Sequence, residues 1–181
     1  MDLFEASSQR NIEELKKLIQ SGVDINAKDI EDGRTALYHA ISPNPGSIEC
    51  MNFLLDSGAD VNTKDNTGFT PLHKAAVHCI NIEGVNSLIH AGADINCQDV
   101  DGNTALHMAA YGGRDENIKA LLEAYADSTL VNKYEQTPED ISGSEAVFRD
   151  HRIAQEKAIL EKEGPQNLIG RQTPRISRGR M

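Results

Sequence analysis

Tryptophan is absent from this sequence, and aromatic residues make up only 4% of its 181 positions. Alanine and leucine must therefore supply most of the packing, which favours thin stacked layers of helices over one thick globular core. The longest uninterrupted apolar run has four residues, Met108 to Tyr111, so no membrane span is expected. The acidic start Met-Asp-Leu-Phe-Glu lacks the basic residues and the apolar run of a signal peptide. These absences predict a cytoplasmic chain.

Cysteine and positive charge are also scarce. The three cysteines, Cys50, Cys79 and Cys97, are interpreted as reduced, buried residues rather than as a disulfide framework. The formal net charge is −10. The segment after Glu163 contains four arginines and no acidic residue, so the first 163 residues carry about −14. Binding to phosphate groups requires clustered lysine and arginine, so this balance argues against nucleic acid as a partner of the main body.

The sequence does contain a repeated motif. Its clearest copy, Gly-Phe-Thr-Pro-Leu-His-Lys-Ala-Ala-Val, occupies residues 68–77, and further copies lie at 102–110 and 33–41, with a fragment at 136–141. The threonines of these copies, at positions 35, 70, 104 and 137, are 35, 34 and 33 residues apart. A second motif keeps step with the first, as Gly-Ala-Asp-Val-Asn does at 58–62. Self-similarity at this period indicates an array of stacked units.

The two motifs in fixed phase resemble the ankyrin repeat, over roughly Met1 to Ile141. The resemblance implies an all-α fold, an ankyrin-repeat solenoid of helix-turn-helix pairs with short hairpin loops, here followed by a C-terminal capping helix. The expected units are an N-terminal capping repeat at 1–29, three repeats at 30–64, 65–98 and 99–131, a partial repeat with the C-terminal helix at 132–163, and a disordered basic tail at 164–181.

Several local features follow from the repeat register. Each signature threonine is expected to cap a first helix. Gly22, Gly58 and Gly92 are expected to end second helices in the left-handed conformation, and Tyr125 replaces that glycine at a cost of ~1 kcal/mol. Residues inserted at 42–47 and near 78–83 fall between paired helices, where insertions are tolerated, and 42–47 is expected to protrude.

The two ends depart from the pattern. Residues 2–21 predict a helix pair without the signature, on which Leu3, Phe4 and Ala6 face inward. Ser142 and Glu145 form a capping-box pattern before a helix that runs to about Glu161. Its apolar residues are expected to cover the open end of the stack: Val147, Phe148, Ile153, Ala154, Ile159 and Leu160.

The histidines of the signature, His73 and His107, invite a metal hypothesis, but zinc requires ligands that converge on one point, and the first copy has Tyr38 there. The resemblance implies instead that each histidine forms a hydrogen bond to the neighbouring repeat. His78 and Cys79 are adjacent on a helix and point in different directions, so they do not form a catalytic pair. The recurring aspartates are read as turn and cap residues, and no cofactor or metal is expected.

The resemblance also implies a concave surface, formed by the hairpin tips and the first-helix faces, that binds a partner. The positions it assigns to partner binding are Arg34, His39, Asn66, Phe69, Lys74, His78, Val100, Asn103, Met108 and Tyr111. Phe69 and Tyr111 are the candidate anchors, because exposed aromatic residues with polar neighbours are typical of interfaces. Alternatively, Phe69 folds back on its own hairpin and Tyr111 packs on the next helix. His39 is expected to be exposed.

The predicted function is therefore binding of another protein by a monomeric, non-catalytic adaptor or inhibitor. A bacterial effector delivered into a host cell would bind a protein in the same way, and the sequence does not separate the two. A small enzyme or metal protein is a further alternative, against which the lack of any catalytic motif argues.

Overall fold

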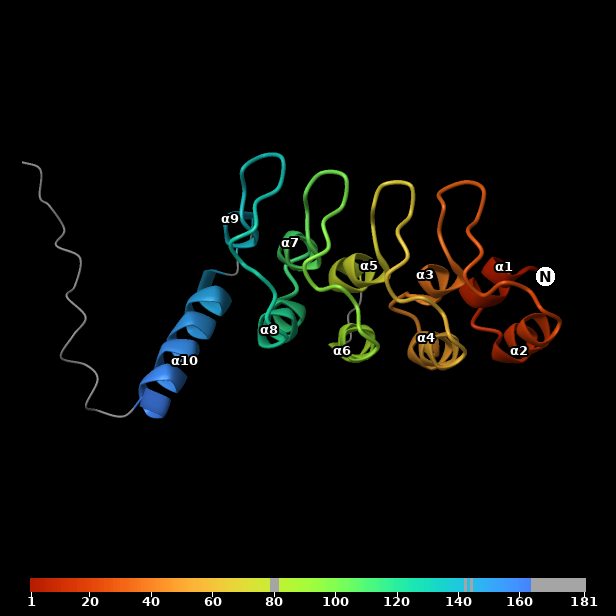
Figure 1. Cartoon of the computed structure of the whole chain (residues 1–181), viewed down its shortest axis with the longest axis horizontal. Coiled ribbons are helices and arrows are strands. Elements are labelled where there is room, and N and C mark those ends of the chain that lie inside the picture. The colour runs from red at the N-terminus through yellow and green to blue at the C-terminus, as the bar shows by residue number, and fades with distance from the viewer. Residues whose placement is uncertain (79–81, 142, 144, 164–181) are drawn as a thin grey trace, which may run out of the picture.

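The computed structural model describes residues 1–78, 82–141, 143 and 145–163. The described residues form ten helices and no strand. They stack as successive pairs, with loops that all project from the same side (Figure 1). This arrangement confirms the predicted all-α solenoid. The first helices of the pairs are α1 (Leu3–Ser8), α3 (Ala36–Ala40), α5 (Pro71–His78), α7 (Ala105–Tyr111) and α9 (Pro138–Ile141). The second helices are α2 (Ile12–Gln20), α4 (Ser47–Asp56), α6 (Ile82–His90), α8 (Asp115–Glu123) and α10 (Glu145–Glu163).

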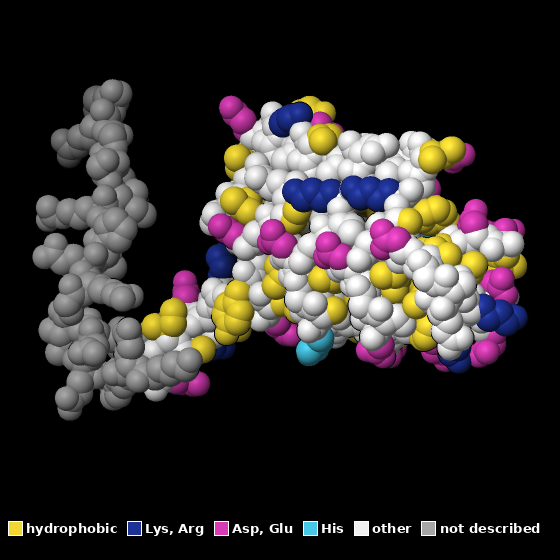
Figure 2. Space-filling model, turned by 45° about the vertical axis from the view of Figure 1, so that its right-hand side comes forward, with side chains coloured by type: hydrophobic (Ala, Val, Ile, Leu, Met, Phe, Trp, Pro, Cys, Tyr) yellow, Lys and Arg dark blue, Asp and Glu magenta, His cyan; other side chains and the backbone are white. Residues whose placement is uncertain are grey.

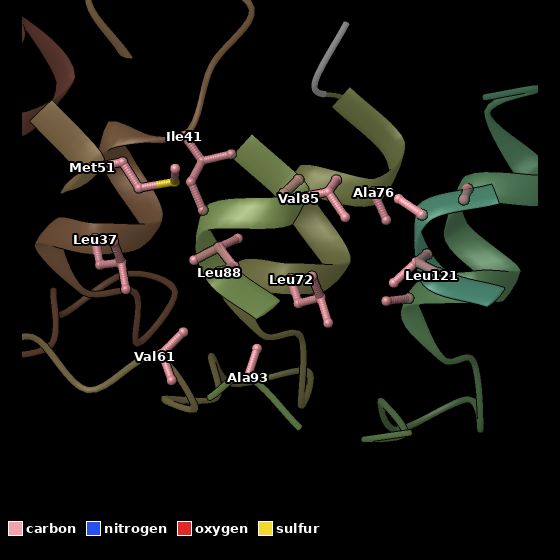
Figure 3. Close-up of a cluster of buried hydrophobic side chains, with 14 of the residues drawn as sticks. Leu37, Ile41, Met51, Val61, Leu72, Ala76, Val85, Leu88, Ala93 and Leu121 are labelled. Atoms are coloured by element: carbon pink, nitrogen blue, oxygen red, sulfur yellow. The ribbon is translucent and has the colours of Figure 1, made fainter. Parts of the chain in front are cut away.

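The apolar core runs along the stack between the layer of first helices and the layer of second helices. Leu37, Leu72 and Leu106 come from equivalent places on three first helices and are almost fully buried. Met51, Leu88 and Leu121 face them from the second helices, as Figure 3 shows for several of these side chains. Each unit therefore buries its apolar side chains against its neighbours, which is how an array of this kind is stabilised.

The projecting loops, here called fingers, are held by side chains at their base. In the second finger, Asp65 Oδ1 accepts hydrogen bonds from the backbone N–H of Thr67 and Phe69, at 2.8 and 3.0 Å. Asp29, Asp99 and Asn132 make the corresponding bonds in the other fingers. The prediction that the recurring aspartates serve turns is confirmed for Asp65 and Asp99.

Neighbouring fingers are joined by backbone hydrogen bonds. The N–H of Asn66 donates to Asp32 O at 2.8 Å, Val100 to Thr67 O at 2.9 Å, and Lys133 to Asp101 O at 2.8 Å. A row of asparagines adds a second connection, because Asn26 Oδ1 accepts from Asp60 N at 2.8 Å and later units repeat this bond. The fingers thus form one continuous, hydrogen-bonded row.

The seam between the first two repeats is thinner than the next one. Helix α5 packs extensively against α7 and only slightly against α3. On the side of the second helices, α4 and α6 leave a groove of about 610 Å³. The segment Ser42–Ser47, which connects α3 to α4, has an exposed tip at Pro43–Pro45, as predicted. Insertion between paired helices is tolerated here without loss of the stack.

The C-terminal helix differs from the prediction. Val147 and Phe148 of α10 are buried, and α10 packs on α8, but Ile153 and Ile159 are 42% and 48% exposed and Ala154 is exposed. The expected contacts of these three residues are wrong. Helix α9 has only four residues, which are too few to pack along the nineteen residues of α10. Helix α10 therefore projects away from the stack (Figure 1). The side chain of Leu160, the Ser142 cap and the basic tail lie outside the described residues.

Candidate functional site

The signature histidines connect neighbouring repeats. His73 Nδ1 accepts the backbone N–H of Thr70 at 3.2 Å, and His107 Nδ1 accepts that of Thr104 at 3.1 Å. Because Nδ1 accepts, the ring proton is on Nε2, which donates across the repeat boundary. The acceptors are Asn103 O for His73, at 3.0 Å, and Gln136 O for His107, at 3.1 Å. The structural reading of both histidines is confirmed.

In the first repeat, Tyr38 occupies the place of the histidine and its surroundings change. Lys74 Nζ donates to Tyr38 O at 2.8 Å and lies 4.3 Å from the centre of the Tyr38 ring. The guanidinium carbon of Arg34 lies 4.9 Å from the same ring centre. Both distances fall within the range of cation–π attraction. Two of the ten candidate residues, Arg34 and Lys74, are therefore brought together on one aromatic ring.

The acidic groups near these cations are largely occupied. Asp65 is 3% exposed at its side chain and already accepts backbone hydrogen bonds, while its Oδ2 lies 3.7 Å from Arg34 Nε. Asp32 forms an ion pair with Arg34 Nη1 and remains 51% exposed at its side chain. Burial raises the pKa of the Tyr38 hydroxyl, so the ring stays neutral beside the cations.

His39 is less accessible than predicted. Its side chain is 24% exposed, its Nε2 is 2.7 Å from Asp29 Oδ2, and its ring lies 5.7 Å from that of Phe4. Burial alone would raise the pKa of Asp29, but hydrogen bonds from His39 and from the N–H groups of Asp32 and Arg34 outweigh it and lower that pKa to about 2. The expectation of a freely exposed His39 is wrong, because Phe4 of α1 and Asp29 of the first finger lie against its ring.

The two candidate anchors have different surroundings. Phe69 is half-buried, and its ring lies 5.0 Å from that of His73 at an angle of 32°. This contact favours the alternative in which Phe69 folds onto its own unit. Tyr111 is 74% exposed and borders a pocket of about 270 Å³ with Gln136, Asp140 and Ile141. Its predicted alternative, burial against the next helix, is wrong.

The other candidates divide between exposed and half-buried positions. Val100 is 53% exposed, and Asn66 and His78 are exposed as well. Met108 packs partly on the core, and Asn103 accepts a hydrogen bond from Asn132 Nδ2 at 3.0 Å. Sequence reasoning missed further exposed apolar residues in the fingers, Ile30 at 100% and Tyr134 at 72%. The repeat register could have found Tyr134, because it occupies the same place in its finger as Asp101 does in the preceding one.

The described residues contain no group of three or more His, Cys, Asp or Glu side chains placed to hold a metal ion. Cys50 and Cys97 are buried free thiols, as predicted, and burial raises the pKa of Cys50 to about 11. Cys79, which was interpreted in the same way, lies outside the described residues. Within the part of the chain that is described, no helix has the length and apolar character needed to cross a bilayer.

Comparison with known families agrees with this geometry. A model of ankyrin repeats in three copies matches residues 3–99, and a second ankyrin-repeat model, for many copies, matches residues 80–124. The chain belongs to the ankyrin-repeat family. No curated protein matches it. Ankyrin repeats are protein-interaction modules and generally not enzymes, so the surface of this ankyrin-repeat chain, rather than a reactive centre, is the place to look for its function.

Proposed function

We propose that this protein acts by binding another protein through its concave surface, without chemistry, as an adaptor or inhibitor. The observation that carries the proposal is Tyr111, a large aromatic side chain that is 74% exposed on a first helix. The same repeat has two more apolar residues at positions that the repeat register assigns to partner contact: Val100, which is 53% exposed in the finger, and Met108, which is partly exposed on the helix of Tyr111. Exposed apolar groups rimmed by polar side chains are typical of interfaces.

Rigidity supports the same proposal. The fingers are tied to each other by backbone bonds of 2.8 to 2.9 Å, and the bases of the fingers are tied to the helices through His73 and His107. A surface fixed in this way loses little conformational freedom on association, so that a few anchor residues can dominate the affinity.

The test is capture of partner proteins by the immobilised full chain, with the captured proteins identified by mass spectrometry. Tyr111→Ala is expected to abolish capture, because truncation of an exposed aromatic anchor typically costs ≥ ~2 kcal/mol, or about thirtyfold in affinity. Circular dichroism of this variant should keep the helical signal and a melting temperature close to that of the unaltered protein.

Matched controls lie on the second helices. Lys16 and Lys119 are 46% and 54% exposed at their side chains and pair with glutamates on their own helices. Lys16→Ala with Lys119→Ala should leave capture intact. If these controls abolish capture while the aromatic variant retains it, the partner binds the second-helix side and the proposal is wrong.

A further inference from the structure

The fold uses only one of the two carboxylate oxygens of Asp140. Its Oδ2 accepts hydrogen bonds from the hydroxyl and the backbone N–H of Thr137, at 2.6 and 2.8 Å. These bonds hold the pKa of Asp140 below its usual 3.8, so the group is charged at neutral pH. Within the part of the chain that the structure describes, Oδ1 makes no hydrogen bond or ion pair. The neighbouring Glu139 differs, because Arg152 donates to both of its oxygens.

Asp140 lines a pocket of about 270 Å³ together with an aromatic ring and an amide. The other lining residues are Tyr111, Gln136 and Ile141. Tyr111 is 74% exposed, and among the described residues its ring has no aromatic or cation contact. The backbone carbonyl of Gln136 accepts from His107, but its side-chain amide makes no hydrogen bond to a described residue. The pocket therefore offers an accessible ring, a charged oxygen and an amide oxygen.

The charge of the rest of the molecule favours a cation at this pocket. The first 163 residues carry about −14, and on the face shown in Figure 2 acidic side chains lie along the stack and outnumber lysine and arginine. Among the described residues that line the pocket, none is a lysine or an arginine. At the other end of the concave surface, Arg34 already pairs with Asp32. A field of this sign attracts a basic segment and repels an acidic one.

The place of Asp140 in the repeat explains why its carboxylate is available. At the same position in the preceding units, His73 and His107 use their outer nitrogen to join the next repeat. No further repeat follows Asp140 in the described chain, so its second oxygen has no unit to join. The first helices α3, α5 and α7 contain no Asp or Glu, so the unpaired acidic group lies at the C-terminal end of this surface.

We infer that the pocket beside Tyr111 binds an arginine side chain from a basic segment of the partner protein. The inference rests on the proposed function and adds the chemistry of the partner. A guanidinium stacks on an aromatic ring and donates several N–H groups in its own plane, so it can lie on Tyr111 and donate to Asp140 Oδ1 and Gln136 Oε1. An apolar side chain would remove the carboxylate and the amide from water without a bond in return.

The experiment is selection of a random peptide display library on the immobilised full-length protein, followed by sequencing of the enriched pool. The pool is expected to be enriched in arginine relative to the starting library. One synthetic peptide from the pool is then titrated. Replacement of its arginine by citrulline, which keeps the shape and removes the charge, should weaken binding about tenfold or more. Salt should weaken the arginine peptide more than the citrulline peptide.

Two variants of the protein and a matched control locate the site. Tyr111→Ala and Asp140→Asn should each lower the affinity for the arginine peptide about tenfold, and asparagine keeps an oxygen for Thr137 while it removes the charge. Asp127→Asn is the control, because Asp127 is also exposed and accepts from the hydroxyl and N–H of Thr129, at 2.7 and 2.9 Å, but does not line the pocket. It should change the affinity less than about twofold. Melting curves verify that every variant is folded.

A pool without arginine enrichment, no enrichment at all, or an equal loss of affinity in Asp127→Asn overturns the inference. So does a gain in affinity when the four arginines after Glu163 are changed to glutamine, since the pocket would then hold this chain's own tail. Peptides without arginine that still require Tyr111 overturn the inference and leave the proposed function standing. Peptides indifferent to Tyr111→Ala count against both.

Discussion

At the scale of single residues, one repeat position shows how a side chain decides whether units are connected. His73 and His107 accept from their own threonine and donate to the next unit, over 3.0 and 3.1 Å. Asp140, at the same position in the last unit, accepts from Thr137 at 2.6 and 2.8 Å, but its carboxylate has no N–H with which to donate to a further unit. In the first repeat, where Tyr38 replaces the histidine, the bond to the next repeat comes from Lys74, whose Nζ donates to Tyr38 O. Among the described residues, the histidine-mediated connection therefore joins the second repeat to the third and the third repeat to the last unit, and it is missing between the first two repeats.

This arrangement predicts a pH dependence of stability. Burial lowers the pKa of His73 and of His107 below the usual 6.5, although their carbonyl partners act in the opposite direction. The unfolded chain therefore takes up protons at these sites before the folded chain does, so stability is fully present above about pH 6.5 and is lost as the pH falls below it. Urea unfolding at pH 7.5 and 5.5 should show a lower midpoint at the lower pH.

The variant His73→Gln with His107→Gln isolates the two groups, because the other histidines remain. We expect it to be less stable at pH 7.5 and to lose less stability on acidification, by up to about 1.4 kcal/mol per pH unit for each histidine. Asp29, whose pKa is lowered to about 2, stays charged throughout this range and does not contribute. A midpoint that shifts with pH as much in the variant as in the parent contradicts the assignment.

The signature histidine was predictable because it recurs, whereas the pairing of Arg34 and Lys74 on Tyr38 was not. That cluster joins residues 34, 38 and 74, which stand at motif positions where the copies differ from one another, so the motif gives no sign that they meet. The position of His39 was missed for a related reason. Its exposure depends on Phe4 and on the Asp29 finger, and the repeat register says nothing about either contact.

At the scale of elements, glycine serves two different purposes in each unit. Gly92 ends helix α6 with φ at 87°, and a Cβ there would meet nothing within 4 Å. Gly68, with φ at 78°, turns a finger, and its Cβ would lie 3.1 Å from Val100 N of the next finger. The first position requires only an unusual backbone conformation, and the second also requires close approach between units.

Substitution by alanine should separate these two requirements. Gly92→Ala is expected to cost ~1 kcal/mol, from the positive φ alone. Gly68→Ala should cost about 1–3 kcal/mol more, because the next finger has to move and its bond from Val100 N to Thr67 O is strained. Urea unfolding of the two variants measures both values. Equal losses of unfolding free energy in the two variants would show that the next finger moves without cost and that neighbouring fingers do not hold one another in place.

The same comparison shows what could be predicted of the elements. The positive φ of Tyr125, at 65°, follows from its place in the motif, and so does the start of each first helix at its threonine. Glu135, at φ of 59°, occupies the finger-glycine position of the last unit, where the motif has worn away. Helix α10 was located correctly, but its docking was not, since its apolar residues do not form one clear stripe to fix a contact face.

At the scale of the whole molecule, the seams between repeats are unequal. Helix α5 packs closely on α7, whereas α3 and α5 touch little and α4 and α6 leave a groove. In a linear array, cooperativity depends on the interfaces between neighbours, so a thin seam marks the place where the stack separates. The repeat motif predicts the number of units and their order, but equal motifs give no sign that one seam is weaker.

The last prediction concerns that seam. Leu72→Ala removes a side chain that is 1% exposed in α5 and should cost roughly 2–5 kcal/mol, and Leu37→Ala makes the matched lesion in α3. Hydrogen exchange with mass spectrometry, at rising urea, should show that Leu72→Ala lowers protection mainly in α5 to α8. Leu37→Ala should lower it mainly in α1 to α4, because the thin seam transmits little of either lesion. Equal loss of protection in both blocks, from either variant, would mean that the stack unfolds as one unit and that its seams are energetically alike.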